Sequence, residues 1–346
     1  MSNKLAIIAD DLTGSNDTGV QFSKKGLKTG VITDFKSITN ALKSLDVLVV
    51  DTESRFDTKK EAYDKVHKVT KILDNNVGYI YKKLDSTLRG NIGGEIAAVM
   101  DAAEVNLAIV VPALPQNGRT TVDGIHLVNN TPLEKTEIAK DPITPVKYSY
   151  VPDIISLQTD KKIGVIHLED VLKGAENISM AIKKLTKKGT EIVVIDALNS
   201  EDLLNIAQAI KIIGQKSIIA GSAGLAEYLP HALELINNNA SNEGSVLIIA
   251  GSVSDITRAQ VNYAAKALNF EVIDLNLEAV FNHKEIEKDR IIDIVKNCIK
   301  ENKDIIVRSA KNRSQVGCAR EEGAKIGLDH YKVSEKIALF LGEVTK

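Results

Sequence analysis

A short stretch of the chain, residues 79–91, combines side chains that could bind and activate a small polar molecule. It reads Tyr-Ile-Tyr-Lys-Lys-Leu-Asp-Ser-Thr-Leu-Arg-Gly-Asn, so an apolar run leads directly into cations, a carboxylate and hydroxyls. Guanidinium groups bind carboxylates and phosphates with two hydrogen bonds, and carboxylates bind sugar hydroxyls, hold Mg²⁺ or accept a proton from an attacking hydroxyl. The mixture suits a small polyhydroxy acid better than an apolar or purely cationic ligand. The candidate substrate-binding residues here are Lys82, Lys83, Asp85, Ser86 and Arg89.

Three other segments place polar residues after apolar runs. These residues are Asp10 and Asp11 after residues 5–9, Arg55 beyond residues 46–51, and Asn117 and Arg119 after residues 107–111. The carboxyl ends of parallel strands lie along one edge of a sheet, where α/β proteins place ligands. We therefore predict that all these residues converge on one substrate site, in which Asp85 and Asp11 are the candidate catalytic groups, as the base or as the holder of Mg²⁺.

Each segment also has a simpler interpretation. Asp10 and Asp11 open the sequence Asp-Asp-Leu-Thr-Gly, which is typical of a turn and a helix cap. Arg55 alone could form a surface ion pair, which is common and weak. Lys82 and Lys83 would point to opposite faces of a strand, so one of them could simply be solvated. The convergence favours a site, and it depends on the predicted sheet.

The apolar runs predict the elements that would position these residues. Short runs typical of buried parallel strands occur at residues 5–9, 28–33, 46–51, 79–83, 107–111, 162–167, 191–196 and 217–220. Helical patterns lie between them, for example at residues 58–73 and 93–103. This alternation predicts a right-handed, mostly parallel sheet with helices on both faces.

Two breaks interrupt the alternation. Residues 112–152 have proline-rich turn chemistry, which predicts a long lid or binding loop. Residues 230–244 contain Asn-Asn-Asn-Ala-Ser-Asn-Glu-Gly and are the best candidate for a linker. A second, smaller α/β block begins with the apolar residues 246–250. At 346 residues the chain is long for one core, so we expect two α/β domains, at residues 1–235 and 245–346.

Small residues follow two strands of the second half, at residues 221–225 and 251–255. Backbone N–H groups at such strand-to-helix turns could face a phosphate, which makes Gly251, Ser252 and Ser254 candidate nucleotide ligands. Neither segment is a Walker loop or a dinucleotide fingerprint, and glycine at a tight turn explains the pattern equally well.

The composition argues against several classes of protein. A net charge of −2 gives no electrostatic reason to expect nucleic acid or a membrane surface as partner, and no apolar run is long enough to span a bilayer. The two cysteines form no disulfide framework and no signal peptide is visible, so we expect a cytoplasmic protein. The histidines lack metal-ligand spacing, and a Gly-x-Ser-x-Gly motif is missing. In an aspartyl-phosphate phosphatase the nucleophile would stand at Ala9, which excludes that class.

Four ordered motifs resemble those of the four-carbon acid sugar kinases. They begin with Ile-Ala-Asp-Asp-Leu-Thr-Gly-Ser-Asn-Asp-Thr-Gly at residues 8–19 and continue at residues 81–91, 112–121 and 132–142. The segment Gly-Ser-Val-Ser at residues 251–254, with Thr257 and Gln260, looks like the start of that family's C-terminal nucleotide domain. The resemblance extends over nearly the whole chain.

The resemblance implies phosphorylation of a tetronate such as D-threonate, D-erythronate or a 3-oxo-tetronate to its 4-phosphate, with ATP and Mg²⁺ as cofactors. It implies an N-terminal domain that binds the acid sugar and a C-terminal domain that binds ATP. By the same resemblance the substrate contacts are Asp11, Arg55, Lys83, Asp85 and Ser86, and the nucleotide contact is Ser254. The expected partners are the sugar acid and ATP, and a homodimer is compatible with the sequence.

Members of that family continue into a glycine-rich Gly-Gly-Asp-Thr segment that cradles the ATP phosphates. Here a helical pattern at residues 335–344 leads to the last residue, Lys346. The resemblance therefore predicts a nucleotide domain that is incomplete at its C-terminus and binds ATP weakly. The alternative function is a non-catalytic acid-sugar binding protein with a defective ATP site. A NAD-dependent dehydrogenase is disfavoured because no Gly-x-Gly-x-x-Gly turn follows an early strand.

Overall fold

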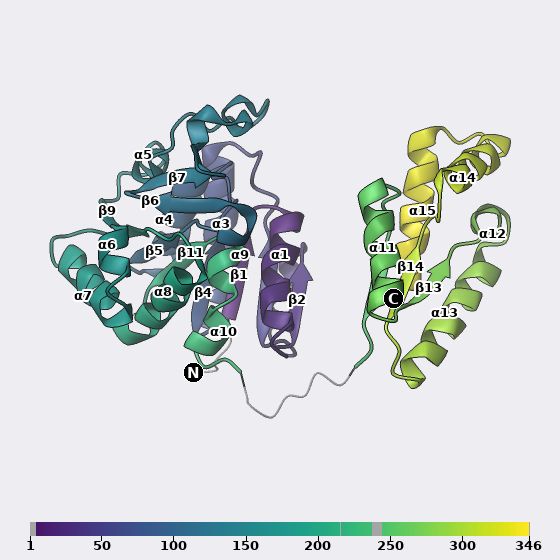
Figure 1. Ribbon diagram of the computed structural model, residues 1–346, viewed down its shortest axis with the longest axis horizontal. Helices are drawn as coiled ribbons and strands as arrows, with labels where there is room; N and C mark the ends of the chain where they lie inside the picture. The colour runs from purple at the N-terminus through teal and green to yellow at the C-terminus, as the bar shows by residue number, and fades with distance from the viewer. Residues whose placement is uncertain (1–4, 215, 237–243, 346) are drawn as a thin grey trace. The chain divides into compact units, whose positions relative to one another are not determined.

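The computed structural model describes residues 5–214, 216–236 and 244–345. They belong to two compact units, Met1–Ser241 and Asn242–Lys346 (Figure 1). Each unit has its own parallel sheet and its own hydrophobic core. This confirms the predicted class, an α/β protein with a large, mostly parallel sheet and a second, smaller α/β domain.

The first unit is built on an eight-stranded parallel sheet with the order β2-β3-β1-β4-β11-β5-β10-β9. Its strands are β1 (Leu5–Ala9), β2 (Thr29–Ile32), β3 (Val47–Asp51), β4 (Tyr79–Lys83), β5 (Ala108–Val111), β9 (Ile163–Ile166), β10 (Ile192–Ile195) and β11 (Ile218–Gly221). Strands covered on both faces read as continuous apolar runs, which is why the sequence pattern located them. Parallel pairing places their carboxyl ends at one edge of the sheet.

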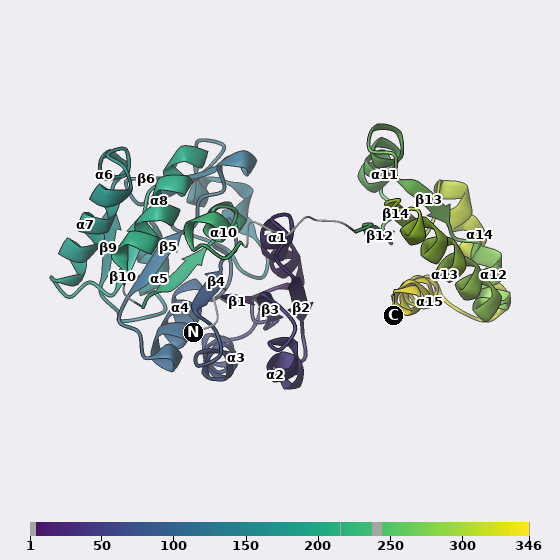
Figure 2. The ribbon, with the colours of Figure 1, turned by 90° about the horizontal axis from the view of Figure 1, so that it is seen from below.

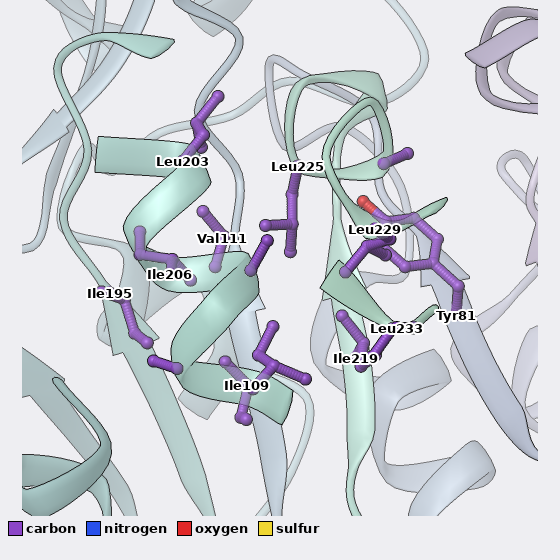
Figure 3. Packing of buried hydrophobic residues seen from close by; sticks show 14 of the residues in the cluster. Tyr81, Ile109, Val111, Ile195, Leu203, Ile206, Ile219, Leu225, Leu229 and Leu233 are labelled. Carbon is purple, nitrogen blue, oxygen red and sulfur yellow. The ribbon is translucent and has the colours of Figure 1, made fainter. Parts of the chain in front are cut away.

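Helices cover both faces of this sheet (Figure 2). One face carries α1 (Leu12–Ser23), α6 (Leu168–Val171), α7 (Ala175–Thr186), α8 (Ser200–Ile213), α9 (Ala223–Ala226) and α10 (Leu229–Ala232). The opposite face carries α2 (Ile38–Ala41), α3 (Lys59–Leu73), α4 (Ile92–Ala103) and α5 (Val151–Ser156). Figure 3 shows side chains of α8 to α10 packed against the strands. Burial of one such aliphatic side chain contributes about 1.5–3 kcal/mol, so both layers hold the strand ends firmly.

Residues 112–152 differ from the predicted loop, because they contain a small antiparallel sheet. Its strands are β6 (Arg119–Val122), β7 (Ile125–Val128) and β8 (Thr131–Pro132), preceded by the 3₁₀ turn η2 (Pro115–Asn117). The hairpin was missed because its strands are short and only partly buried, so their apolar alternation is weak.

The predicted linker starts too early. Pro230 lies inside α10, where a proline in the first turn is well tolerated. Residues 237–243, which hold most of the asparagine-rich segment, lie outside the described residues.

The second unit has a three-stranded parallel sheet with the order β12-β14-β13. Its strands are β12 (Leu247–Ala250), β13 (Glu271–Asp274) and β14 (Ile305–Arg308). Its helices are α11 (Asp255–Ala267), α12 (Leu277–Asn282), α13 (Lys284–Lys300), α14 (Arg313–Lys325) and α15 (His330–Val344), the last of which contains the helical pattern expected at residues 335–344. Within the described part of the chain, none of the helices combines the length and apolar character needed to cross a bilayer.

Candidate functional site

The ends of β1 and β3 are joined by a buried ion pair. The backbone N–H groups of Ser54 and Arg55 both donate to the Asp10 carbonyl, so the segment after β3 folds back over the end of β1. Arg55 then donates from Nε and Nη2 to the two oxygens of Asp10, at 2.7 and 2.9 Å, and from Nη1 to Asp11 at 2.7 Å. Burial alone would lower the pKa of Arg55, but the hydrogen bond and the charge of Asp10 raise it. The guanidinium is therefore permanently charged.

The end of β4 contributes Asp85, which is held as an anion. Its Oδ2 accepts from the Thr87 hydroxyl at 2.5 Å and from Arg89 Nε at 2.9 Å. Arg55 Nη2 lies 3.8 Å from the other oxygen, Oδ1. Burial would raise the pKa of Asp85, but the hydrogen bonds from Arg89 and Thr87 outweigh it and hold that pKa well below its usual range. Arg55 thus connects the β1 and β4 ends.

Lys83 places a buried ammonium beside these groups. The side chain is 4% exposed, and Nζ donates to the Leu84 carbonyl at 2.7 Å. A Cβ at Gly14 would lie 2.9 Å from Lys83 Nζ and 2.6 Å from Asp11 Oδ1, so glycine there leaves room for both at the start of α1. Burial lowers the pKa of Lys83, although Asp10, Asp85 and Asp11 oppose the shift. We call Asp10, Asp11, Arg55, Lys83, Asp85 and Arg89 the strand-end cluster.

Lys82 departs from the sequence-based expectation, because it points to the other face of β4 and is fully buried. Its ammonium is enclosed by Glu95 Oε2 at 2.8 Å and by the carbonyls of Lys83 and Ile8. Glu95 in turn accepts from the Ser54 hydroxyl at 2.6 Å. A lysine whose donors are satisfied in this way has none to offer a ligand. Lys82 therefore has a structural role on the other face of β4 and does not line the candidate site.

Glu95 was not singled out from the sequence, although a signal exists. It lies in the otherwise apolar residues 92–100 of α4, apart from the exposed Asp101, and its burial must be compensated by a cation. The partner is Lys82, one of the two lysines at the end of β4, so the sequence offers a candidate pair but does not show which lysine makes it.

Asn117 and Arg119 lie farther along the sheet edge, because β11 is inserted between β4 and β5. Asn117 is exposed in η2, and its carbonyl accepts from Arg119 Nη1 at 2.5 Å. Arg119 Nε is buried without a hydrogen-bond partner among the described residues. Within the described part of the chain, no hydrogen bond or ion pair joins either residue to the strand-end cluster, so their predicted role stays a prediction.

Ser86 is partly exposed directly after Asp85, and a histidine that sequence reasoning missed holds its carbonyl. His126 lies fully buried in β7, with Nε2 at 2.8 Å from the Ser86 oxygen and Nδ1 at 3.0 Å from the Thr121 hydroxyl. Burial lowers the pKa of His126 to about 4, against opposing effects of the Ser86 carbonyl and Asp85. The imidazole is therefore neutral near pH 7. Scattered histidines carry little signal in a sequence, and only the hairpin brings this one to the site.

A cavity of about 330 Å³ opens beside the cluster. Its lining includes the polar Arg55 and Asn91, the buried Leu88, and the exposed Ile143, Tyr148 and Leu157. This mixed polar and apolar lining suits a small ligand that enters from solvent.

The second unit exposes the candidate nucleotide ligands Gly251, Ser252 and Ser254. The Ser254 hydroxyl caps α11 by accepting from the Thr257 N–H at 3.2 Å, and Ser252 accepts from the Ser254 N–H at 3.3 Å. This exposed helix start offers N–H groups to a phosphate. Asp255 in the first turn would repel an anion, but its carboxylate is paired with Arg258. The local arrangement therefore fits a phosphate group.

The described residues contain one group whose side chains could hold a metal ion, formed by Asp123, His167 and Asp196. The sequence did not connect them, because the hairpin turn and the ends of β9 and β10 meet only in the fold. Both oxygens of Asp196 already accept backbone N–H groups, from Asp123 at 2.7 Å and Gly124 at 2.9 Å. Asp196 therefore links the hairpin turn to the end of β10 through these hydrogen bonds.

Two family models match the chain. One describes a sugar-binding N-terminal domain and covers residues 5–229, and the other describes a nucleotide-binding C-terminal domain and covers residues 247–346. A D-threonate kinase of Salmonella typhimurium is 35% identical over 99% of this chain and 80% of its own length. The chain belongs to the four-carbon acid sugar kinase family. The predicted resemblance is thereby confirmed.

Other members of the four-carbon acid sugar kinase family show the same relationship. A D-erythronate kinase of Heliobacterium modesticaldum is 36% identical over 91% of this chain and 73% of its own length. A 3-oxo-tetronate kinase of Haemophilus influenzae is 29% identical over 82% and 70%, respectively.

Solved structures support the fold of the family. A Haemophilus influenzae protein with 24% identity superposes with a TM-score of 0.72 over 98% of this chain and 82% of its own. A Bordetella bronchiseptica protein with 26% identity gives a TM-score of 0.59 over 99% and 79%, and its crystal structure is a domain-swapped dimer with bound citrate.

Proposed function

We propose that this chain is an ATP-dependent tetronate kinase, which transfers a phosphoryl group to the terminal hydroxyl of a four-carbon sugar acid and releases the 4-phosphate and ADP. The observation that carries the proposal is the strand-end cluster, in which cations and carboxylates converge at the edge of the sheet within the sugar-binding match. The names of the relatives support the same reaction.

The cations of the cluster account for recognition of the acid. Among the described residues, the Lys83 ammonium donates to one acceptor, the Leu84 carbonyl, which leaves two of its three N–H groups for the substrate carboxylate. Arg55 donates three of its five N–H groups to Asp10 and Asp11, so it mainly holds both carboxylates in place. The Asp85 carboxylate then accepts hydrogen bonds from the sugar hydroxyls, and the Ser86 hydroxyl donates to them or accepts from them. Arg89 adds positive charge at the edge of the cluster.

The two candidate catalytic carboxylates have different environments. Asp85 is stabilised as an anion by Arg89 and Thr87, which makes it a weak proton acceptor that orients hydroxyls. Asp11 accepts one hydrogen bond on each oxygen, from Gly14 N–H at 2.8 Å and from Arg55 at 2.7 Å, and its side chain is 26% exposed. We therefore assign to Asp11 the role of the base that accepts the proton of the terminal hydroxyl. A weak base is sufficient, because phosphoryl transfer depends mainly on positioning and charge stabilisation.

ATP is assigned to the second unit, with Gly251, Ser252 and Ser254 at the start of α11 as phosphate ligands. Mg²⁺, when bound with ATP, neutralises charge on the phosphates. The carboxylates of the strand-end cluster are engaged by Arg55 and Arg89, so they are poorly suited as metal ligands in this arrangement. The proposal is therefore that Mg²⁺ enters with the nucleotide. Residues 1–235 form the substrate domain and residues 245–346 the nucleotide domain.

A homodimer is the proposed assembly, supported by the dimer of the Bordetella bronchiseptica relative. Light scattering coupled to size exclusion would test it, and a monomer at micromolar concentration would contradict it.

A coupled assay of ADP release tests the function. ATP, Mg²⁺ and one of D-threonate, D-erythronate or a 3-oxo-tetronate should give turnover with at least one acid, and the product should carry phosphate on its terminal oxygen. A parallel thermal-shift series with the same acids measures binding alone. Stabilisation by an acid without turnover would contradict the kinase and favour the alternative, a non-catalytic acid-sugar binding protein. Neither turnover nor stabilisation would contradict the assignment of the cluster.

A further inference from the structure

His126 has no role in the proposed chemistry, yet it is fully buried and reaches the segment that carries Asp85. A carbonyl oxygen can only accept a hydrogen bond, so Nε2 must carry the proton that is donated to Ser86 at 2.8 Å. Nδ1 is then an acceptor, and the Thr121 hydroxyl donates to it at 3.0 Å. Both ring nitrogens are satisfied in one tautomer, which leaves the imidazole no alternative partner at this site.

The segment that His126 holds is a tight turn. The Leu88 N–H donates to the Asp85 carbonyl at 2.9 Å, and Leu88 has a φ of 58°, in the left-handed region that costs a leucine energy. Thr87 and Arg89 donate to the Asp85 carboxylate from within the same turn. A strained turn stays in one conformation only where its surroundings fix it. The His126 bond to Ser86 comes from a different element and supplies such a restraint.

The hairpin that carries His126 is itself anchored to the sheet. The Thr121 N–H donates to the Ala197 carbonyl at 3.0 Å, beyond the end of β10. Asp196 accepts two N–H groups from the hairpin turn, at Asp123 and Gly124. A rigid path therefore leads from β10 through the hairpin and His126 to the turn that presents Asp85 and Ser86.

We propose that His126 is a positioning residue: by holding the Ser86 carbonyl it keeps the turn of residues 85–89 in the arrangement that binds the sugar acid. The inference rests on the proposed function for its substrate, but the restraint on the turn stands independently of catalysis. His126 itself touches neither substrate nor nucleotide in this scheme.

Two substitutions separate this role from general packing. The amide nitrogen of a glutamine matches Nε2 in distance from the backbone, so His126→Gln keeps a donor for Ser86. The amide of an asparagine reaches only as far as Nδ1, so His126→Asn loses that donor and leaves the Ser86 carbonyl unpaired. His126→Asn should raise the KM and the Kd for the sugar acid about tenfold, which is the expected effect of one lost buried hydrogen bond. His126→Gln should stay within about threefold of the wild type, and the KM for ATP should change little in either variant.

Hydrogen exchange on the full chain gives a readout that does not require turnover. Amides of residues 85–90 should exchange faster in His126→Asn than in His126→Gln, while α4 remains protected in both. His231→Asn, at an exposed histidine of α10, is the matched control and should change nothing. Equal behaviour of the asparagine and glutamine variants would overturn the proposal. So would wild-type exchange and affinity in His126→Asn.

The wild-type protein provides a measurement that no folding defect can obscure. Imidazole nitrogen chemical shifts at pH 7 should show a neutral His126 protonated on Nε2. A proton on Nδ1 would overturn the inference, because the Ser86 carbonyl would then lack its donor. If the wild type neither binds nor phosphorylates any tetronate, the proposed function fails, whereas the exchange data still decide whether His126 restrains the turn.

Discussion

Arg55 donates a hydrogen bond to each oxygen of Asp10, from Nε to Oδ2 at 2.7 Å and from Nη2 to Oδ1 at 2.9 Å, although the two residues lie 45 positions apart in the sequence. This two-pronged geometry needs a planar guanidinium, and a lysine cannot reproduce it. Because the same arginine also holds Asp11 and approaches Asp85, the positions of three carboxylates depend on one side chain.

Arg55→Lys should lower kcat/KM for the sugar acid by about 100-fold, because at least one charge-assisted hydrogen bond worth about 1.5–3 kcal/mol is lost and the carboxylates shift. Steady-state kinetics checks this. Arg290→Lys is the control, since Arg290 makes a similar two-pronged pair with Glu287 on α13 of the second unit. Equal effects of both substitutions would mean that Arg55 matters only for stability.

Lys83 makes the binding of the acid dependent on pH. Burial lowers the pKa of Lys83 from its usual 10.5, and the ammonium attracts the substrate carboxylate only while it is protonated. Affinity for a tetronate should therefore fall as the pH rises through this lowered pKa, before an ordinary lysine would titrate. Calorimetric Kd values between about pH 7 and 10 measure it, a range that lies below the ordinary lysine pKa of about 10.4. Lys83→Met should bind weakly at every pH, and an unchanged pH dependence in that variant would refute the assignment.

The ion pair of Lys82 and Glu95 predicts a large effect on stability. Lys82→Met leaves a buried carboxylate without its cation, which costs about 3–5 kcal/mol of unfolding free energy. Adding Glu95→Gln should recover part of that loss. Lys60→Met is the control, because Lys60 pairs with Asp64 at an exposed site and its loss should leave the free energy of unfolding unchanged. Urea unfolding measures all these variants, and a loss no larger than that of the control would contradict the buried pair.

The pH dependence of the Lys82→Met variant follows from the same pair. Burial raises the pKa of Glu95, and Lys82 opposes the shift, so removal of the lysine raises that pKa further. A carboxyl group with a raised pKa in the folded state binds more protons than the unfolded chain. The contribution of Glu95 to the stability of the variant should therefore be fully present below the unfolded pKa, about 4.3, and be lost as the pH rises through the folded value. Unfolding curves at several pH values measure this dependence, and a free energy of unfolding that rises over the same pH range would contradict it.

Ser254→Ala tests the nucleotide assignment. Loss of the α11 cap should cost about 1 kcal/mol of local stability and raise the KM for ATP several-fold, while the Kd for the sugar acid stays unchanged. Asn312→Ala removes the corresponding cap of α14 and is the matched control. If both variants raise the KM for ATP equally, the effect reports helix stability and not phosphate contact.

How much of this could be predicted from the sequence depended on burial. Strands covered on both faces, such as β1 and β3, read as continuous apolar runs, and their polar ends were located correctly. The alternation of Lys82 and Lys83 showed that they face opposite sides, but it could not show which side holds the ligand. That choice depends on Glu95, whose approach to Lys82 is a tertiary contact.

The order of the strands was beyond local reasoning. The insertion of β11 between β4 and β5 separates Asn117 and Arg119 from the other strand ends, and no local pattern records it. His126 was missed for a similar reason, because its importance comes from the Ser86 carbonyl, 40 residues away in the sequence.

The insertion of β11 also determines when the first unit can fold during synthesis. β4 and β5 pair with β11 and not with each other, so each lacks one neighbour until the strand that ends at Gly221 has been made. The Leu84 N–H, next to Asp85, needs the Gly221 carbonyl as its acceptor. Because β4 also pairs with β1 and β5 with β10, a nascent chain shorter than this leaves one edge of each strand without its partner. Long-range pairing of this kind slows folding. The edge of β4 that leads into Asp85 is therefore completed only once nearly all of the first unit has left the ribosome.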